Sequence, residues 1–190
     1  MFDIEPEMVF WCYGQRTALH ETLVNKNFNM IQGMPANFDF VTKNSIVVLD
    51  DLMAESANDI QITNLFIRAA HHKPCFIIMV RQNLFPQGKQ SRNQSLNANY
   101  MVLFKNPADR LQIDILSRRM LPNSKNFLTW AFEQATERPY SYLFLDNHNK
   151  TAENARVRAR ILPSQRPMAC YVDKRLYGGI TTSKHLKRLH

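Results

Sequence analysis

The sequence predicts an α/β fold, in which a parallel sheet is covered by helices on both faces. Five short apolar runs alternate along the chain with segments whose apolar residues recur at helical spacing. Within each run the apolar residues are consecutive and do not alternate with polar ones, which is typical of strands that are buried on both faces. Of the 190 residues, 45% are hydrophobic and 21% are charged. This composition is that of a globular domain.

The expected strands are short and rich in branched or aromatic residues. The first run ends at Gly14, and the second ends in two carboxylates. The five runs are Met8–Tyr13, Ser45–Asp51, Cys75–Asn83, Asn99–Lys105 and Tyr140–Asp146.

Three segments between these runs predict helices, because their apolar residues fall on one face. They are Asp59–His72, Asn106–Met120 and Ser124–Pro139. In the second segment we expect Asn106 as the N-cap, with Pro107 at the first helical position. The third is expected to stop before its proline, because the residue that precedes a proline disfavours helical backbone angles.

Bulk properties narrow the class of protein. The net charge of +8 favours an anionic partner, most simply nucleic acid. The three cysteines, Cys12, Cys75 and Cys170, have no paired spacing and predict free thiols in a reducing compartment. No run approaches the roughly 18 apolar residues of a membrane span, and the acidic start is not a signal peptide. We therefore expect an intracellular protein that is not secreted and has no membrane partner.

Adjacent carboxylates, Asp50 and Asp51, end the second run. One interpretation is a strand that happens to end in a polar turn. The other is the acidic strand of a nucleotide hydrolase, where the first acid orients the Mg²⁺ shell and the second polarises the attacking water. Gln82 and Asn83 end the next run, where an amide can sense a γ-phosphate, although amides are also common in turns. The residues alone leave both interpretations open.

Other side chains do little to decide between a polar turn and a nucleotide site. Arg68 lies off the apolar face of its expected helix, and it is either a plain surface residue or an arginine finger toward a neighbouring subunit's nucleotide. His71 and His72 lack a third ligand at metal spacing, so zinc is not predicted. The sequence also lacks the G-x-S-x-G pattern of acyl-transfer enzymes.

A nucleotide hydrolase of this kind needs the phosphate loop G-x-x-x-x-G-K-[ST], or Walker A motif. None of the five glycines fits that pattern. The nearest stretch, NLFPQGKQ, contains Gly88-Lys89, but it also contains Pro86 and has Gln90 where the Mg²⁺-binding hydroxyl belongs. The sequence therefore has the acidic half of a nucleotide site, the Walker B strand, without the phosphate-binding half.

Three stretches of the chain resemble a known family. They are IVVLDDLM, the long stretch from ITNLFIRAAHH to NPADRLQI, and PYSYLFLD. Together they resemble the genome-packaging ATPases of the FtsK/HerA group carried by large DNA viruses, virophages, adintoviruses and Maverick/Polinton transposable elements. The likeness covers about Met8 to Pro163. Its most specific part is VRQNLFPQGKQSRNQSLNANYMVLFKNPAD.

The resemblance implies a RecA-like P-loop NTPase core with strand order 5-1-4-3-2. It implies a homo-oligomeric ring that uses ATP and Mg²⁺ to drive double-stranded DNA into a capsid, with capsid proteins as further partners and the nucleus or a viral assembly site as the location. By this resemblance Asp50 serves Mg²⁺ through water, Asp51 is the catalytic acid, and Gln82 is the polar sensor. The role of Arg68 as an arginine finger is our own assignment.

The chain departs from the family pattern at both ends. The family's first strand, phosphate loop and first helix precede the equivalent of MVFWCYGQ, so we expect a partial ATPase domain over residues 1–163, incomplete at its N-terminus. Residues 164–190 are expected to form a basic, flexible tail. We expect this chain alone to be marginally stable and not to hydrolyse ATP. The alternatives are a DNA-binding remnant without catalysis and a relic without function.

Overall fold

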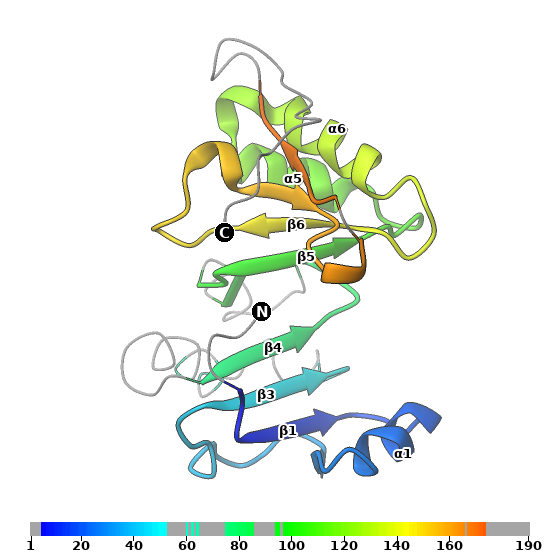
Figure 1. Cartoon of the computed structure of the whole chain (residues 1–190), viewed down its shortest axis with the longest axis vertical. Helices are drawn as coiled ribbons and strands as arrows, with labels where there is room; N and C mark the ends of the chain where they lie inside the picture. Colours follow the sequence, from blue (N-terminus) through cyan, green and yellow to red (C-terminus); the bar gives the residue numbers. More distant parts are fainter. Residues whose placement is uncertain are drawn as a thin grey trace. The chain divides into compact units, whose positions relative to one another are not determined.

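The chain divides into two compact units, residues 1–97 and residues 98–190. The structure is a computed structural model (Figure 1). It describes residues 5–52, 60, 62, 64, 75–85, 94–95, 97–165 and 167–173. Within these ranges no helix is long and apolar enough to cross a membrane.

A parallel sheet of four strands forms the first unit, in the order β2-β1-β3-β4. The strands are β1 (Met8–Tyr13), β2 (Asn29–Gln32), β3 (Ser45–Asp50) and β4 (Phe76–Val80). The positions of β1, β3 and β4 were predicted from their apolar runs and are confirmed. Strand β2 was not predicted, because it is only four residues long and has a polar residue at each end.

One face of this sheet carries the hydrophobic core of the first unit. Alternate residues of β1 and β3 point to this face, because successive side chains of a strand face opposite ways. The buried cluster consists of Phe10, Cys12, Val41, Val47, Leu49, Leu52 and Ile62. Ile62 is fully buried, as the apolar face predicted over 59–72 requires. Residues 60, 62 and 64 are helical, and the rest of that segment, Arg68 included, lies outside the described residues.

The opposite face carries Trp11 and Tyr13 of β1. Helix α1 (Ala18–Val24) lies against these rings through His20, which is buried. The ring centroid of His20 is 4.3 Å from that of Tyr13 and 6.4 Å, edge-on, from that of Trp11. The backbone N–H of Thr17 donates to Nδ1 of His20 at 2.7 Å. His20 therefore joins the start of α1 to the aromatic side chains of the sheet.

The second unit contains an antiparallel sheet in the order β5-β6-β7-β8. Its strands are β5 (Tyr100–Phe104), β6 (Tyr142–Asp146), β7 (Val157–Ala159) and β8 (Ala169–Tyr171). Two helices connect β5 to β6 and pack on each other, α5 (Leu111–Met120) and α6 (Lys125–Ala135). Short 3₁₀ helices span Pro122–Ser124, Glu153–Ala155 and Pro163–Gln165.

The pairing of β5 and β6 corrects the prediction of a single parallel sheet. Both strands lie where the sequence placed them, but they run antiparallel to each other. An apolar run indicates burial and says nothing of strand direction. Moreover, the run at β5 is not buried on both faces, since Tyr100 and Phe104 are 53% and 60% exposed. The chain is thus a mixed α/β protein with its parallel sheet in the first unit.

Two predicted boundaries also differ from the structure. Asn106 is not the N-cap of α5, which begins at Leu111. Instead, Oδ1 of Asn106 accepts the N–H of Ala108 at 3.0 Å, a local turn that competes with helix initiation. Residues 169–171 belong to the segment that we expected to be a flexible tail, yet they form β8 and pair with β7. Three residues are too few to show the apolar pattern of a strand in the sequence, so β8 is recognised only from its pairing with β7.

Candidate functional site

Three polar residues lie at the carboxyl edge of the parallel sheet. Asp50 is the last residue of β3, Asp51 follows it, and Gln82 lies two residues beyond β4. Because β3 and β4 are parallel neighbours, both strands end at the same edge. Nε2 of Gln82 donates a hydrogen bond to Oδ1 of Asp51 at 3.3 Å. Arg68, the fourth residue predicted for this site, lies outside the described residues.

Asp50 is held by an aromatic donor that the sequence analysis did not identify. The indole Nε1–H of Trp11 donates to Oδ2 of Asp50 at 3.3 Å. In the register of the sheet Asp50 pairs with Tyr13, two residues beyond Trp11, so the three side chains share one face. A hydrogen bond to a carboxylate is charge-assisted and stronger than one between neutral groups. Asp50 is half-buried, and the indole therefore compensates part of its desolvation.

Asp51 occupies a backbone conformation that few residues adopt. Its φ is 54°, in the left-handed region where aspartate and asparagine are tolerated better than most residues. The backbone N–H of Gly14, just after β1, donates to the carbonyl of Asp50 at 3.1 Å. A Cβ at Gly14 would lie 2.7 Å from the carbonyl oxygen of Asp51. Glycine is therefore needed for β1 to end this close to the two carboxylates.

A half-buried arginine fixes the loop that carries Gln82. Nη2 of Arg81 donates to Oε1 of Gln94, and Gln94 is only 2% exposed. Burial lowers the pKa of Arg81, but an arginine starts from so high a value that it stays protonated. Nε of Arg81 is buried without a hydrogen-bond partner among the described residues. The loop beyond β4 is thus tied at Arg81, the residue next to the proposed sensor.

The donor chemistry of the two aspartates fits a hydrated Mg²⁺ ion. Among the described residues, no group of three or more His, Cys, Asp or Glu side chains is placed to hold a metal ion. Mg²⁺ does not need such a cage, since it keeps several waters and binds one or two carboxylates together with substrate phosphates. One oxygen of Asp50 and one of Asp51 accept the hydrogen bonds described above. The second oxygen of each carboxylate can accept a hydrogen bond from a metal-bound water.

Three residues of this site were missed from the sequence, namely Trp11, Gly14 and His20. The sequence did indicate that Trp11 and Tyr13 lie on the same face of their strand, because side chains alternate between the two faces. Its significance depended on the register between β1 and β3, which the sequence does not show. Gly14 was identified only as the end of a strand, and His20 gave no signal that distinguished it from an ordinary helical residue.

Comparisons with models of protein families, with curated proteins and with solved structures gave no match.

Proposed function

We propose that this chain carries the acidic half of the nucleotide site of a DNA-translocating motor of the FtsK/HerA genome-packaging type. The observation that carries the proposal is the contact between Gln82 and Asp51 at 3.3 Å. It joins the residues assigned as polar sensor and catalytic acid, although they lie 31 residues apart in the sequence. A strand that merely ended in a polar turn would not require this contact.

The strand order supports the same proposal. The neighbours β4, β3 and β1 are all parallel, and they follow the 4-3-2 part of the order 5-1-4-3-2 that the resemblance implies. In this arrangement β3 is the acidic strand and β4 the sensor strand. The strand that carries the phosphate loop would then add beside β4, on the side away from β3.

In the proposed reaction Asp50 would hold a hydrated Mg²⁺ ion, while Asp51 polarises the water that attacks the γ-phosphate. Gln82 holds this water and contacts the phosphate, and Arg68 acts on the nucleotide of a neighbouring subunit in a homo-oligomeric ring. Mg²⁺ supplies charge neutralisation on the phosphate oxygens when it is bound. ATP binding requires a phosphate loop from another segment or another chain, so the described residues alone are not expected to turn over ATP.

The first test is to sequence the transcript upstream of Met1 over about 60 codons, enough for one strand, a phosphate loop and a helix. An in-frame strand followed by G-x-x-x-x-G-K-[ST] would support the proposal. A stop codon or an unrelated sequence would contradict a nucleotide site within one chain.

The second test measures ATP hydrolysis by the chain extended with that segment. We expect Asp51→Asn and Gln82→Ala to lower kcat by about 10²- to 10⁴-fold, the range for a residue that activates a nucleophile. Asp39→Asn is the matched control, since Asp39 is an exposed acid of the same unit. Equal turnover in Asp51→Asn and Asp39→Asn would refute the role of Asp51.

A second candidate function is DNA binding without catalysis, and the distribution of charge favours it. Residues 98–190 contain 16 lysines and arginines against 7 acids, whereas residues 1–97 contain 8 against 9. This function predicts an affinity for DNA that falls steeply with salt and does not respond to Mg²⁺ or nucleotide. Asp50→Ala would leave it unchanged, whereas a motor would lose the response to nucleotide.

A further inference from the structure

Helices cover one face of the antiparallel sheet of the second unit. On the other face, called the open face below, the edge strand β5 is exposed, whereas Tyr142 of β6 is only 7% exposed. Leu143 and Leu145 of β6 are fully buried, and Tyr171 of β8 meets Trp130 of α6 with ring centroids 5.8 Å apart. These side chains mark the covered face. The opposite face begins with alternate residues of β5, namely Tyr100, Val102 and Phe104, which are 53%, 48% and 60% exposed.

Aromatic rings continue across this open face from β5 to β6. Tyr100 stacks on Phe144, with centroids 5.7 Å apart and planes 24° apart. Phe104 lies 5.8 Å from Tyr142 at a tilted angle. The strand register accounts for both pairs. Phe104 is directly opposite Tyr142, whereas Tyr100 is opposite Asp146 and is therefore a diagonal neighbour of Phe144, two residues earlier on β6. The exposed rings are therefore held in place by neighbours on the sheet.

One more exposed ring lies at the end of this sheet. Tyr140, just before β6, is 95% exposed and has a φ of 60°. A bulky residue in the left-handed region is strained, and such strain often accompanies a functional contact. Tyr140 and Phe104 line one shallow cavity of about 370 Å³, together with Lys105 and Arg138. Glu137 also lines it and is its one acid.

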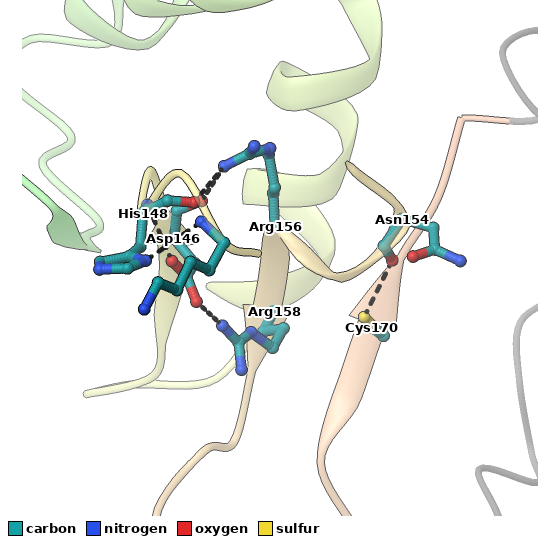
Figure 2. A network of polar contacts seen from close by, with 7 residues as sticks. Asp146, His148, Asn154, Arg156, Arg158 and Cys170 are labelled. Carbon is teal, nitrogen blue, oxygen red and sulfur yellow. Dashed lines mark hydrogen bonds and ion pairs between the residues drawn. The ribbon is translucent and has the colours of Figure 1, made fainter. Parts of the chain in front are cut away.

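Positive charge accompanies these rings. The guanidinium of Arg158 lies 5.1 Å from the ring centroid of Phe144, while Nη2 of the same arginine is paired with Asp146 at the end of β6 (Figure 2). Lys105 and Arg138 are both exposed at the end with Tyr140. The excess of lysine and arginine over acids is confined to residues 98–190, where it amounts to 16 against 7.

We propose that the open face of this sheet binds single-stranded nucleic acid. Unpaired bases stack on Tyr100, Phe104 and Tyr140, and phosphates lie against Lys105 and Arg138. Exposed aromatic residues on a sheet, flanked by cations, are the combination that accommodates unstacked bases and a charged backbone. A duplex hides the faces of its bases and cannot use the rings in this way. The inference goes beyond the proposed motor function, since it requires neither nucleotide nor Mg²⁺.

The test is fluorescence anisotropy of the full chain with fluorescein-labelled dT₁₂, rU₁₂ and a 12-base-pair duplex of mixed sequence. We expect both single strands to bind more tightly than the duplex. The tighter of the two shows whether the surface prefers DNA or RNA. Phe104→Thr and Tyr100→Thr should each weaken binding of that strand by about 5- to 100-fold, the usual effect of losing one stacked base. Lys105→Gln should reduce the magnitude of the slope of log affinity against log salt concentration by about 1, the effect of losing one phosphate contact.

Three further variants separate stacking from folding. Phe104→Tyr and Tyr100→Phe keep a ring at each site and should bind like the wild type, even where the threonine variants lose stability. Leu111→Thr removes an apolar side chain that is 62% exposed on α5 and should bind unchanged. Tighter binding of the duplex, no binding of either single strand, or equal affinity of the threonine and ring-keeping variants would each overturn the proposal.

Discussion

Nε1 of Trp11 lies 3.3 Å from Oδ2 of Asp50, and this hydrogen bond joins two strands through side chains that are 39 residues apart in the sequence. It ties the proposed metal-side carboxylate to the aromatic face of the parallel sheet. Trp11 in turn contacts His20 and stacks on Phe28, at centroid distances of 6.4 and 6.3 Å. The orientation of Asp50 therefore depends on packing around α1 as well as on its own strand.

Removing this donor should destabilise the first unit. Trp11→Phe keeps a ring in the aromatic cluster but leaves a half-buried carboxylate with one donor fewer. We expect the free energy of unfolding, measured by urea denaturation, to fall by about 1.5–3 kcal/mol, the effect of losing a hydrogen bond to a charged group. Trp130→Phe makes the same chemical change at an indole for which no carboxylate partner is found in the described part of the chain. A loss as large as that of Trp11→Phe would contradict this account.

The two described glycines should respond differently to alanine. At Gly14 the new Cβ would meet the carbonyl oxygen of Asp51 at 2.7 Å, whereas at Gly33, which has a φ of 80°, nothing lies within 4 Å. Gly33→Ala should cost about 1 kcal/mol through its backbone angle alone. Gly14→Ala should cost about 2–3 kcal/mol, because backbone atoms must shift. Denaturation midpoints of the two variants would decide the order, and the reverse order would show that β1 and Asp51 are not in close contact.

Burial of Cys12 should make stability fall at alkaline pH. Burial raises the pKa of this thiol from 9.0 to about 11. Below pH 9 the thiol is protonated in both the folded and the unfolded state, and its contribution to the free energy of unfolding is fully present. Between pH 9 and 11 the unfolded chain releases the proton first, so stability falls as pH rises, by up to about 2 kcal/mol.

The measurement compares the pH dependence of unfolding in the wild type and in Cys12→Ala. The comparison removes the contribution of other groups that titrate in this range, such as Tyr171 and Cys170, whose pKa values burial also raises. The variant should be less stable overall, but its stability should decline less between pH 9 and 11. Parallel curves for the two proteins would refute the burial of Cys12.

The ion pairs of the second unit should differ in their contribution. The side chain of Asp146 is 7% exposed; it pairs with Arg158 and accepts the N–H of His148 at 3.0 Å. Asp146→Ala leaves the arginine without its carboxylate and should cost about 3 kcal/mol. Glu153→Ala breaks the 2.7 Å pair with Arg156, but Glu153 is 62% exposed, so we expect a loss below about 1 kcal/mol.

Thermal and urea denaturation of these two variants would measure the difference. Nη1 of Arg156 also donates to the backbone carbonyls of Asp146 and His148, both at 3.1 Å (Figure 2). These bonds do not involve Glu153, so we expect them to persist when Glu153 is removed. Similar losses in both variants would mean that the burial of Asp146 has no energetic consequence.

Much of the local structure was predictable from runs of residues. The positions of β1, β3, β4, β5 and β6 follow from continuous apolar segments, since each run holds enough branched or aromatic side chains to favour a strand. The placement of Asp50, Asp51 and Gln82 at one edge followed from two adjacent strands that end in polar residues. Strands of three or four residues, such as β2 and β8, were not predictable because their side chains carry too little pattern.

The sequence by itself determined where the apolar strands lie and which acids follow them, because these features depend on neighbours along the chain. Only the tertiary structure decided that β5 and β6 run antiparallel, that Trp11 donates to Asp50, and that Gly14 must lack a side chain. Each of these depends on register and distance between segments remote in sequence. A hydrogen bond or a steric contact acts only over a few ångströms, so folding has to bring both partners together before either residue acquires its role.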